Sequence, residues 1–146
     1  MVDVGSKPVS ARVARARSRL RAQPSTIRAI ETQTVKKGDV LAVARVAGIM
    51  AAKRTSELIP LCHPIPISAV TVTMETHDTA VEITAEAKTE AQTGVEMEAL
   101  TAVSVAALTV YDMCKSLDRG MTIECTELIS KSGGVHGDWI RPEEPA

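Results

Sequence analysis

The feature that most constrains this chain is a long helical stretch without charge. Across residues 95–117, apolar side chains recur at spacings of three and four: Leu100, Val103, Ala107, Val110, Cys114 and Leu117. Between Ala99 and Tyr111 there is no charged residue, so this helix is apolar nearly all round. Such a helix must be buried on several sides. A single domain of 146 residues has little surface with which to cover it, so the pattern predicts a homo-oligomer.

Alternation with period two predicts strands around this helix. Residues 12–22 place four arginines on one side and small or apolar residues on the other, so the small residues are expected to face the core. Residues 69–75 and 81–87 alternate on either side of a short polar segment and predict a hairpin. Another strand is expected from Met121 onward.

A second helix is expected from Asp39, its N-cap, to about Arg54, with Val40, Val43, Ala47 and Met50 along one stripe. The resulting order is β-α-β-β-α-β, which predicts an α+β, ferredoxin-like fold with an antiparallel sheet packed against helices. Residues 1–136 are expected to form one domain. Residues 137–146, rich in Pro and Glu, are expected to form a mobile tail.

Composition excludes several classes of protein. With one Trp, one Tyr and no Phe, the chain lacks the aromatic platforms on which nucleic-acid bases stack. A net charge of −1 gives no overall attraction to nucleic acid. No uncharged run reaches the roughly 18 residues of a membrane helix, and no apolar leader is present near residue 1. Three cysteines without a CxxC pair indicate reduced thiols, so a cytoplasmic protein is expected. The three histidines have no ligand spacing, so no metal site is predicted.

The polar residues of the long helix lie at its two ends. Glu96 and Glu98 stand at its start, and Asp112 and Lys115 stand near its finish. Asp112 and Lys115 form a candidate acid–base pair, with an ion pair at the helix end as the alternative. The apolar neighbours of Asp112 are expected to raise its pKa, an effect that Lys115 opposes. Glu98 and Asp112 lie about 21 Å apart along the helix, so one chain cannot bring both to one reacting atom.

Three further segments are candidates for binding. Residues 58–67 contain three prolines around His63, which predicts a rigid loop whose histidine either binds a ligand or bonds to local backbone. Lys131 followed by Gly133 and Gly134 is either an anion-binding nest or a polar turn. The arginine strand is either a solvated sheet face or a nucleic-acid surface.

Four segments together resemble the MoaC family: Leu61–Pro64, Thr93–Ala102, Tyr111–Lys115 and Lys131–Gly134. Met1–Val4, Arg12 and Lys37–Val40 match as well, so the resemblance extends from about Met1 to Asp138. It implies a cyclic pyranopterin monophosphate synthase of molybdenum cofactor biosynthesis. Such a lyase converts 3′,8-cyclo-7,8-dihydroguanosine 5′-triphosphate into cyclic pyranopterin monophosphate and pyrophosphate.

The resemblance also implies roles for individual residues. Asp112 is the catalytic residue, and Leu61, Cys62, His63, Met97 and Glu98 line the substrate site. Lys37 and Lys115 join Asp112 as catalytic candidates, and Glu96, Arg12 and Lys131 are further binding candidates. The family assembles as a hexamer, a trimer of dimers with pockets between subunits. No cofactor is expected, although a Mg²⁺ ion accompanying the triphosphate stays open.

One departure from the family pattern concerns the phosphate. Val135 stands where relatives commonly have Lys or another polar residue, which removes one phosphate contact, and His136 is a candidate substitute. Two other hypotheses stay open, the first because of Val135 and the second because of the arginine strand. The chain is an inactive paralogue, or it is a non-catalytic module that binds nucleotide or RNA through its arginine strand.

Overall fold

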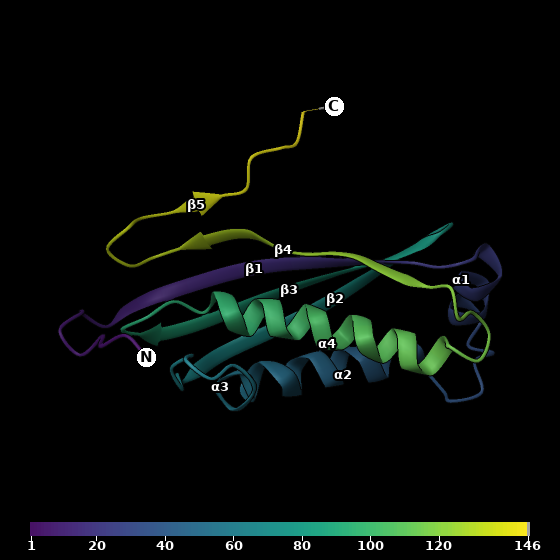
Figure 1. Ribbon diagram of the computed structural model, residues 1–146, viewed down its shortest axis with the longest axis horizontal. Helices are drawn as coiled ribbons and strands as arrows, with labels where there is room; N and C mark the ends of the chain where they lie inside the picture. The colour runs from purple at the N-terminus through teal and green to yellow at the C-terminus, as the bar shows by residue number, and fades with distance from the viewer. Residues whose placement is uncertain (146) are drawn as a thin grey trace.

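A computed structural model describes residues 1–145 as a five-stranded sheet with four helices. Helices α2 and α4 lie side by side along the sheet, and α1 lies at one end of it (Figure 1). The elements in chain order are β1 (Ser10–Arg21), α1 (Pro24–Glu31), α2 (Val40–Lys53), α3 (Thr55–Leu58), β2 (Ile67–His77), β3 (Ala80–Ala91), α4 (Glu96–Cys114), β4 (Thr122–Ser132) and β5 (Trp139–Ile140).

The sheet has the order β2-β3-β1-β4-β5, and every neighbouring pair is antiparallel. Strands β1 and β2 are joined through α2 and are separated in the sheet by β3. Strands β3 and β4 are joined through α4 and are separated by β1. This interleaving is the ferredoxin-like arrangement, so the predicted fold class is confirmed.

The core depends on small side chains that let the helices approach each other and the sheet. On β1, Ala14, Ala16, Ser18 and Leu20 are fully buried, which confirms the predicted inner face of that strand. Helix α4 contributes seven fully buried residues: Ala99, Ala102, Val103, Ala106, Ala107, Val110 and Cys114. On α2, Gly48 lies so close to α4 that an added Cβ would be 2.9 Å from the Ala102 carbonyl oxygen. By length and composition α4 could cross a membrane, but here it packs against the sheet and α2.

The predicted stripe on α2 is oriented differently from what its spacing suggested. Asp39 caps the helix as expected, accepting a hydrogen bond from the Ala42 amide at 3.1 Å. However, Val43 and Met50 are 45% and 47% exposed, while Ala44 and Gly48 are buried. The smaller residues face inward because close contact with α4 leaves no room for larger ones.

Three elements were not predicted: α1, α3 and β5. For α1 the residue that stabilises its start is distant in sequence. Helix α1 begins after Gln23 without a capping side chain of its own. Asp118, nearly 100 residues later, accepts hydrogen bonds from the Gln23 amide at 2.8 Å and the Thr26 hydroxyl at 3.1 Å. A buried carboxylate from the turn after α4 thus satisfies the start of α1, which local sequence does not reveal.

Part of the expected tail lies in the sheet. Trp139 and Ile140 of β5 pair with Lys131 and Ser130 of β4, and the Arg141 amide donates to the Ile129 carbonyl at 2.8 Å. Residues 139–140 are therefore a short edge strand instead of an unpaired tail. Whether the rest of this segment is mobile stays a prediction, and residue 146 lies outside the described residues.

Candidate active site

The first group of predicted site residues meets at the carboxyl end of α4. Lys115 Nζ lies 2.6 Å from Asp112 Oδ1, and Lys37 Nζ lies 3.0 Å from Asp112 Oδ2. Lys37 also donates to the Asp112 carbonyl oxygen at 3.2 Å, which fixes the loop before α2 against the end of α4. One carboxylate therefore holds two ammonium groups, although the three residues come from two distant parts of the sequence.

The pKa of Asp112 moves in the direction opposite to the expected one. The Lys115 and Lys37 ammonium groups, which hydrogen-bond to the carboxylate, lower the pKa of Asp112. Its side chain is 56% exposed, so the apolar neighbours in the sequence do not surround the carboxyl group. Asp112 is consequently an ionised carboxylate that accepts hydrogen bonds from two ammonium groups.

The second group lies at the amino end of α4, and its carboxylate is buried and partly unpaired where Asp112 is exposed and paired. Glu98 is 3% exposed, and its Oε2 atom is buried without a hydrogen-bond partner among residues 1–145. Burial, aided by the nearby Glu96 charge, raises the pKa of Glu98. Its Oε1 atom lies 4.0 Å from the Cys62 sulfur. Burial, together with the charges of Glu98 and Glu96, raises the pKa of the Cys62 thiol, so this cysteine is a weak nucleophile.

The proline-rich loop brings its residues to a cavity beside this end of α4. The cavity has a volume of about 300 Å³ and is lined by Leu61, Cys62, His63, Glu96 and Met97 among others. His63 Nε2 lies 2.7 Å from the Val2 carbonyl oxygen, so this histidine bonds to the backbone of the amino-terminal segment and not to local backbone. This hydrogen bond holds the amino-terminal segment against the proline-rich loop.

Arg12 and Lys131 complete the group. Lys131 Nζ lies 3.0 Å from Glu96 Oε1, and Arg12 Nε donates to the Ala91 carbonyl at 3.1 Å. Gly133 and Gly134 follow Lys131 with φ angles of 87° and 85°. The Gly133 N–H, the first amide of the candidate anion-binding nest, donates to Asp138 Oδ1 at 3.2 Å and is not free for an anion. What the two glycines provide is a close approach of the turn to β1 and the Arg12 guanidinium.

The structure therefore brings the predicted residues together in two clusters instead of one. The carboxyl-end cluster contains Lys37, Asp112 and Lys115, and the amino-end cluster contains the other eight predicted residues. Glu98 and Asp112 stand 14 positions apart in α4, which separates the clusters by about 21 Å. No group of three or more His, Cys, Asp or Glu side chains suited to a metal ion occurs within residues 1–145.

Comparison with known proteins identifies the family of this chain. The family model described as the MoaC family matches residues 1–134. The chain belongs to the MoaC family. A protein of Thermomicrobium roseum named cyclic pyranopterin monophosphate synthase is 59% identical over 148 residues, covering 100% of this chain and 89% of the relative. Proteins with the same name from Chloroflexus aurantiacus and Brevibacillus brevis are 59% and 54% identical, covering 97% and 99% of this chain and 88% and 91% of those relatives.

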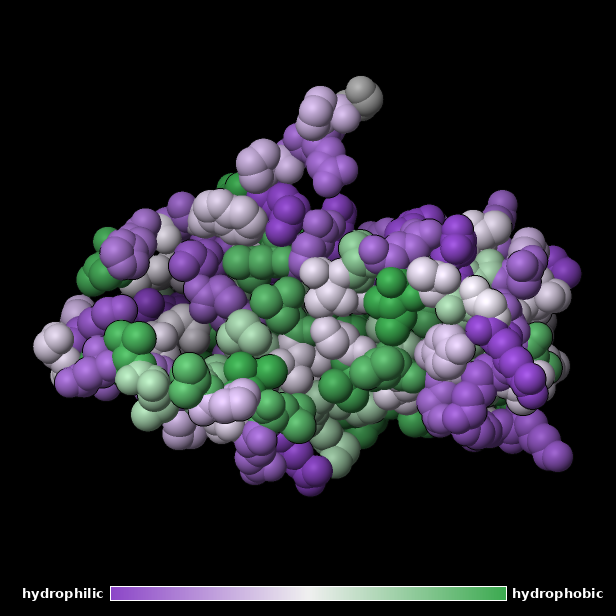
Figure 2. Space-filling view, in the orientation of Figure 1, coloured by the Kyte–Doolittle hydropathy of each residue, from purple (hydrophilic) through white to green (hydrophobic). Residues whose placement is uncertain are grey.

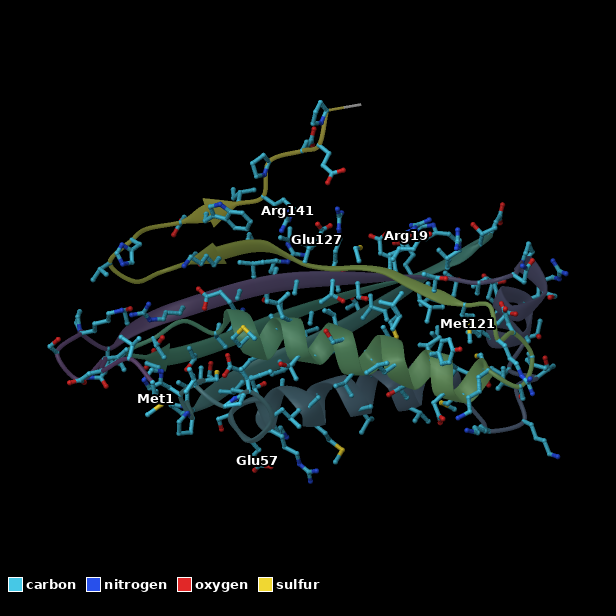
Figure 3. The ribbon with its side chains drawn as sticks, viewed as in Figure 1. Met1, Arg19, Glu57, Met121, Glu127 and Arg141 are labelled. Carbon is cyan, nitrogen blue, oxygen red and sulfur yellow. The ribbon has the colours of Figure 1, made fainter. Side chains whose placement is uncertain are left out.

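The arginine strand of this MoaC-family chain has a different task from the site. On the outer face of the sheet, Arg17 lies 2.6 Å from Glu127, and Arg19 lies 3.4 Å from both Glu82 and Glu124. Arg141 of the tail also reaches Glu127, at 3.4 Å (Figure 3). Carboxylates interleave with the arginines, so this face offers no row of free cations to a phosphate backbone.

The family resemblance predicted Arg12 as a binding residue, but its own signal in the alternation of β1 was missed, and so was Lys7. Arg12 has the same parity on β1 as the buried Ala14 and Ala16, so it extends toward the helix side, opposite to Arg15 and Arg17. An arginine on the inner face of a strand is a signal that alternation alone would have revealed. Lys7 was not singled out. Because the amino-terminal segment folds back, Lys7 lines a small cavity together with Arg12 and Lys131.

Proposed function

We propose that this chain is a cyclic pyranopterin monophosphate synthase, which converts 3′,8-cyclo-7,8-dihydroguanosine 5′-triphosphate into cyclic pyranopterin monophosphate and pyrophosphate. The relatives carry the name of this enzyme across nearly the whole length of the chain. The structural observation that carries the proposal is the Asp112 carboxylate, held between two ammonium groups at 2.6 and 3.0 Å. The reaction rearranges rings and a phosphate ester, which requires placed proton donors and acceptors.

The Asp112 cluster supplies proton transfer. Because the pKa of Asp112 is lowered, its carboxylate stays ionised and aligns the Lys115 and Lys37 ammonium groups. An ammonium group that gives its proton to an opening ring leaves an amine, which is a base for the next step. The cyclic phosphate closes when a sugar hydroxyl attacks the α-phosphorus, its proton goes to such a base, and the bond to pyrophosphate breaks.

The amino-end cluster suits the ring of the substrate. A 2-aminopyrimidinone ring presents neighbouring N–H groups, and the buried Glu98 Oε2 atom is an acceptor without a donor among residues 1–145. Pairing it with ring N–H groups would satisfy a buried oxygen whose isolation costs about 1–3 kcal/mol. Leu61 and Met97 supply apolar contact in a chain that has almost no aromatic side chains.

We further propose that a complete active site combines the Asp112 cluster of one subunit with the amino-end cluster of another. One chain separates them by about 21 Å. Exposed apolar side chains on the two adjacent helices supply a surface for such contact, and Figure 2 shows hydrophobic residues gathered over this layer. They include Val43, Val46, Met50 and Leu108. A hexamer built as a trimer of dimers, as the family resemblance implies, would cover this surface.

The remaining expectations are part of the same proposal. The three cysteines are free, and burial raises the pKa of the Cys114 thiol to about 11, as expected for an inert thiol in a reducing cytoplasm. The chemistry described needs no organic cofactor, and a Mg²⁺ ion would enter with the triphosphate. The substrate is a small molecule, with no role for nucleic acid or membrane.

The deciding experiment is incubation of the purified protein with the cyclised dihydro-GTP. We expect stoichiometric release of pyrophosphate and formation of cyclic pyranopterin monophosphate, detected by chromatography and mass spectrometry. Arg15→Gln is a matched control, because Arg15 lies on the outer sheet face and pairs with Glu86. A folded protein that releases no pyrophosphate would support the inactive-paralogue hypothesis.

A further inference from the structure

Asp118, in the turn after α4, joins the ends of two helices. Its amide donates to the Cys114 carbonyl oxygen at 3.1 Å, which closes the last turn of α4. Its Oδ2 atom accepts hydrogen bonds from the Gln23 amide and the Thr26 hydroxyl at the start of α1. Helix α1 and the carboxyl end of α4 lie at the same end of the sheet (Figure 1). One residue therefore fixes α1 to the end of α4 that carries Asp112.

The Asp118 carboxylate has a defined orientation in this contact. It is 9% exposed, and its second oxygen, Oδ1, accepts a hydrogen bond from the Gly120 amide at 3.2 Å. Thr26 is 2% exposed, and α1 has no capping side chain of its own. Removing the carboxylate would take an acceptor from a buried hydroxyl and from the first turn of α1, which is costly and loosens the attachment of that helix.

The segment after α1 carries Lys37 and is tied to α1. The amides of residues 32–34 donate to carbonyl oxygens of α1 at 2.9 to 3.2 Å. Val35 is then buried in the same core as Ile27 and Ile30 of α1, and Lys37 follows two residues later. Helix α1 and this segment therefore form one unit, so a displacement of α1 also displaces Lys37.

We propose that Asp118 is a positioning residue for the Asp112 cluster, which holds α1, and through it the Lys37 ammonium group, against the end of α4. Lys37 Nζ lies 3.2 Å from the Asp112 carbonyl oxygen and 3.0 Å from Asp112 Oδ2. These two contacts close a ring that runs from Asp112 to Asp118, through α1 and back to Lys37. The effect of Asp118 on activity rests on the proposed function, whereas its effect on the pairing of Lys37 with Asp112 does not.

The first experiment measures steady-state kinetics of Asp118→Ala with the cyclised dihydro-GTP. A displaced proton donor slows the chemical step, so we expect kcat to fall about 10- to 100-fold. KM should change less than about threefold, because the residues proposed to bind the ring lie at the other end of α4. Asp118→Asn keeps an oxygen that caps a helix as well as a carboxylate does, and it should restore most of kcat. Thr26→Val removes one of the hydrogen bonds and should lower kcat about two- to fivefold.

A double variant distinguishes positioning of Lys37 from general damage to the fold. If Asp118 acts through Lys37, adding Asp118→Ala to Lys37→Met should leave kcat within about twofold of Lys37→Met alone. Ser18→Ala is the matched control. The buried Ser18 hydroxyl donates to the Cys125 carbonyl oxygen at 2.9 Å, so this variant also loses a buried hydrogen bond, but between β1 and β4. Its melting temperature should fall while kcat stays unchanged.

Carboxyl-carbon NMR provides a readout that does not depend on activity. Lys115 and Lys37 both lower the pKa of Asp112, so weaker pairing with Lys37 should raise it. We expect the titration midpoint of Asp112 to rise in Asp118→Ala, as it should in Lys37→Met. In Ser18→Ala the midpoint should stay at the wild-type value.

The positioning proposal is overturned if Asp118→Ala leaves kcat and the Asp112 midpoint unchanged, or if its loss of kcat adds in full to that of Lys37→Met. If Asp118→Ala does not fold, Thr26→Val provides the same test, and an unchanged Asp112 midpoint in that variant overturns the proposal. A wild-type protein that does not turn over the cyclised dihydro-GTP refutes the proposed synthase activity alone, because the titration of Asp112 still tests the role of Asp118.

Discussion

The two ends of α4 carry charged groups in opposite physical states. At the carboxyl end, Asp112 is exposed, and both its oxygens are paired with lysines. At the amino end, Glu98 is buried with one oxygen unpaired, and Arg12 nearby has an unpaired buried nitrogen. In the first cluster every charged group is paired within a single chain, whereas the second has buried polar atoms that a ligand, a water molecule or another subunit could satisfy. The proposed function assigns chemistry to the first end of the helix and recognition to the second.

The largest effect is expected at the carboxyl end. Asp112→Asn removes the charge that aligns Lys37 and Lys115, and we expect pyrophosphate release to slow about 10²- to 10⁴-fold, the range of a placed acid or base. The protein should remain folded, because the side chain is exposed. Steady-state rates with the cyclised dihydro-GTP provide the measurement. Full activity in this variant would remove Asp112 from the mechanism.

The second prediction tests whether the two ends of α4 act together across subunits, by mixing one variant from each end. Asp112→Asn and Glu98→Gln should each be nearly inactive alone. When the two variants are unfolded and reassembled together, half of the dimers are mixed, and each mixed dimer has one intact composite site. We therefore expect about a quarter of wild-type activity to return. If no activity returns although mass spectrometry detects mixed assemblies, the site is not shared between subunits.

The third prediction separates stability from function at the amino end. Because burial raises the pKa of Glu98, its protonated form favours folding, and this contribution is lost as pH rises through the folded-state pKa. At pH 7, Glu98→Gln should therefore increase stability by about 1 kcal/mol while activity falls. The gain should disappear below about pH 4, where the wild-type side chain is also neutral. Urea denaturation at several pH values measures the change in stability. A Glu98→Gln variant that is less stable than wild type at pH 7 would contradict the prediction.

The fourth prediction concerns the titration of Asp112. Removing an ammonium partner with Lys115→Met should return the pKa of Asp112 toward its ordinary value, and Lys37→Met should have a smaller effect. Any stability that these pairs contribute is present above the unfolded-state pKa and lost as pH falls through the lower folded-state value. Carboxyl-carbon NMR shifts followed against pH give the measurement. Lys53→Met is the control, because Lys53 lies in α2 and is remote from Asp112.

The smallest effect is expected on the outer face of the sheet. Arg17→Gln breaks the pairing with Glu127, and we expect a loss of about 0.5 kcal/mol that shrinks at high salt. Pyrophosphate release should be unaffected, since this face lies opposite to the helices. A large loss of activity, or salt-sensitive RNA binding that Arg17→Gln abolishes, would favour the nucleic-acid hypothesis instead.

Local patterns predicted those parts of the fold that depend on periodicity. The alternating arginines identified the two faces of β1, and the apolar spacing identified α4, because a side chain's face follows directly from its position in a regular element. The same reasoning was wrong for the α2 stripe. Periodicity finds a stripe, but the fit of Ala44 and Gly48 against α4 decided which stripe is buried.

The sequence by itself determined the family and the order of the long strands and helices, and it supplied most of the candidate site residues, since these depend on residue types and their spacing. Only the tertiary structure decided how those residues act. Burial and pairing are properties of space, so the lowered pKa of Asp112, the unpaired Glu98 and Arg12 atoms and the capping of α1 by Asp118 could not be predicted from neighbours in the chain. The tertiary structure also explains the near absence of aromatic residues, because small side chains let α4 pack closely against its neighbours.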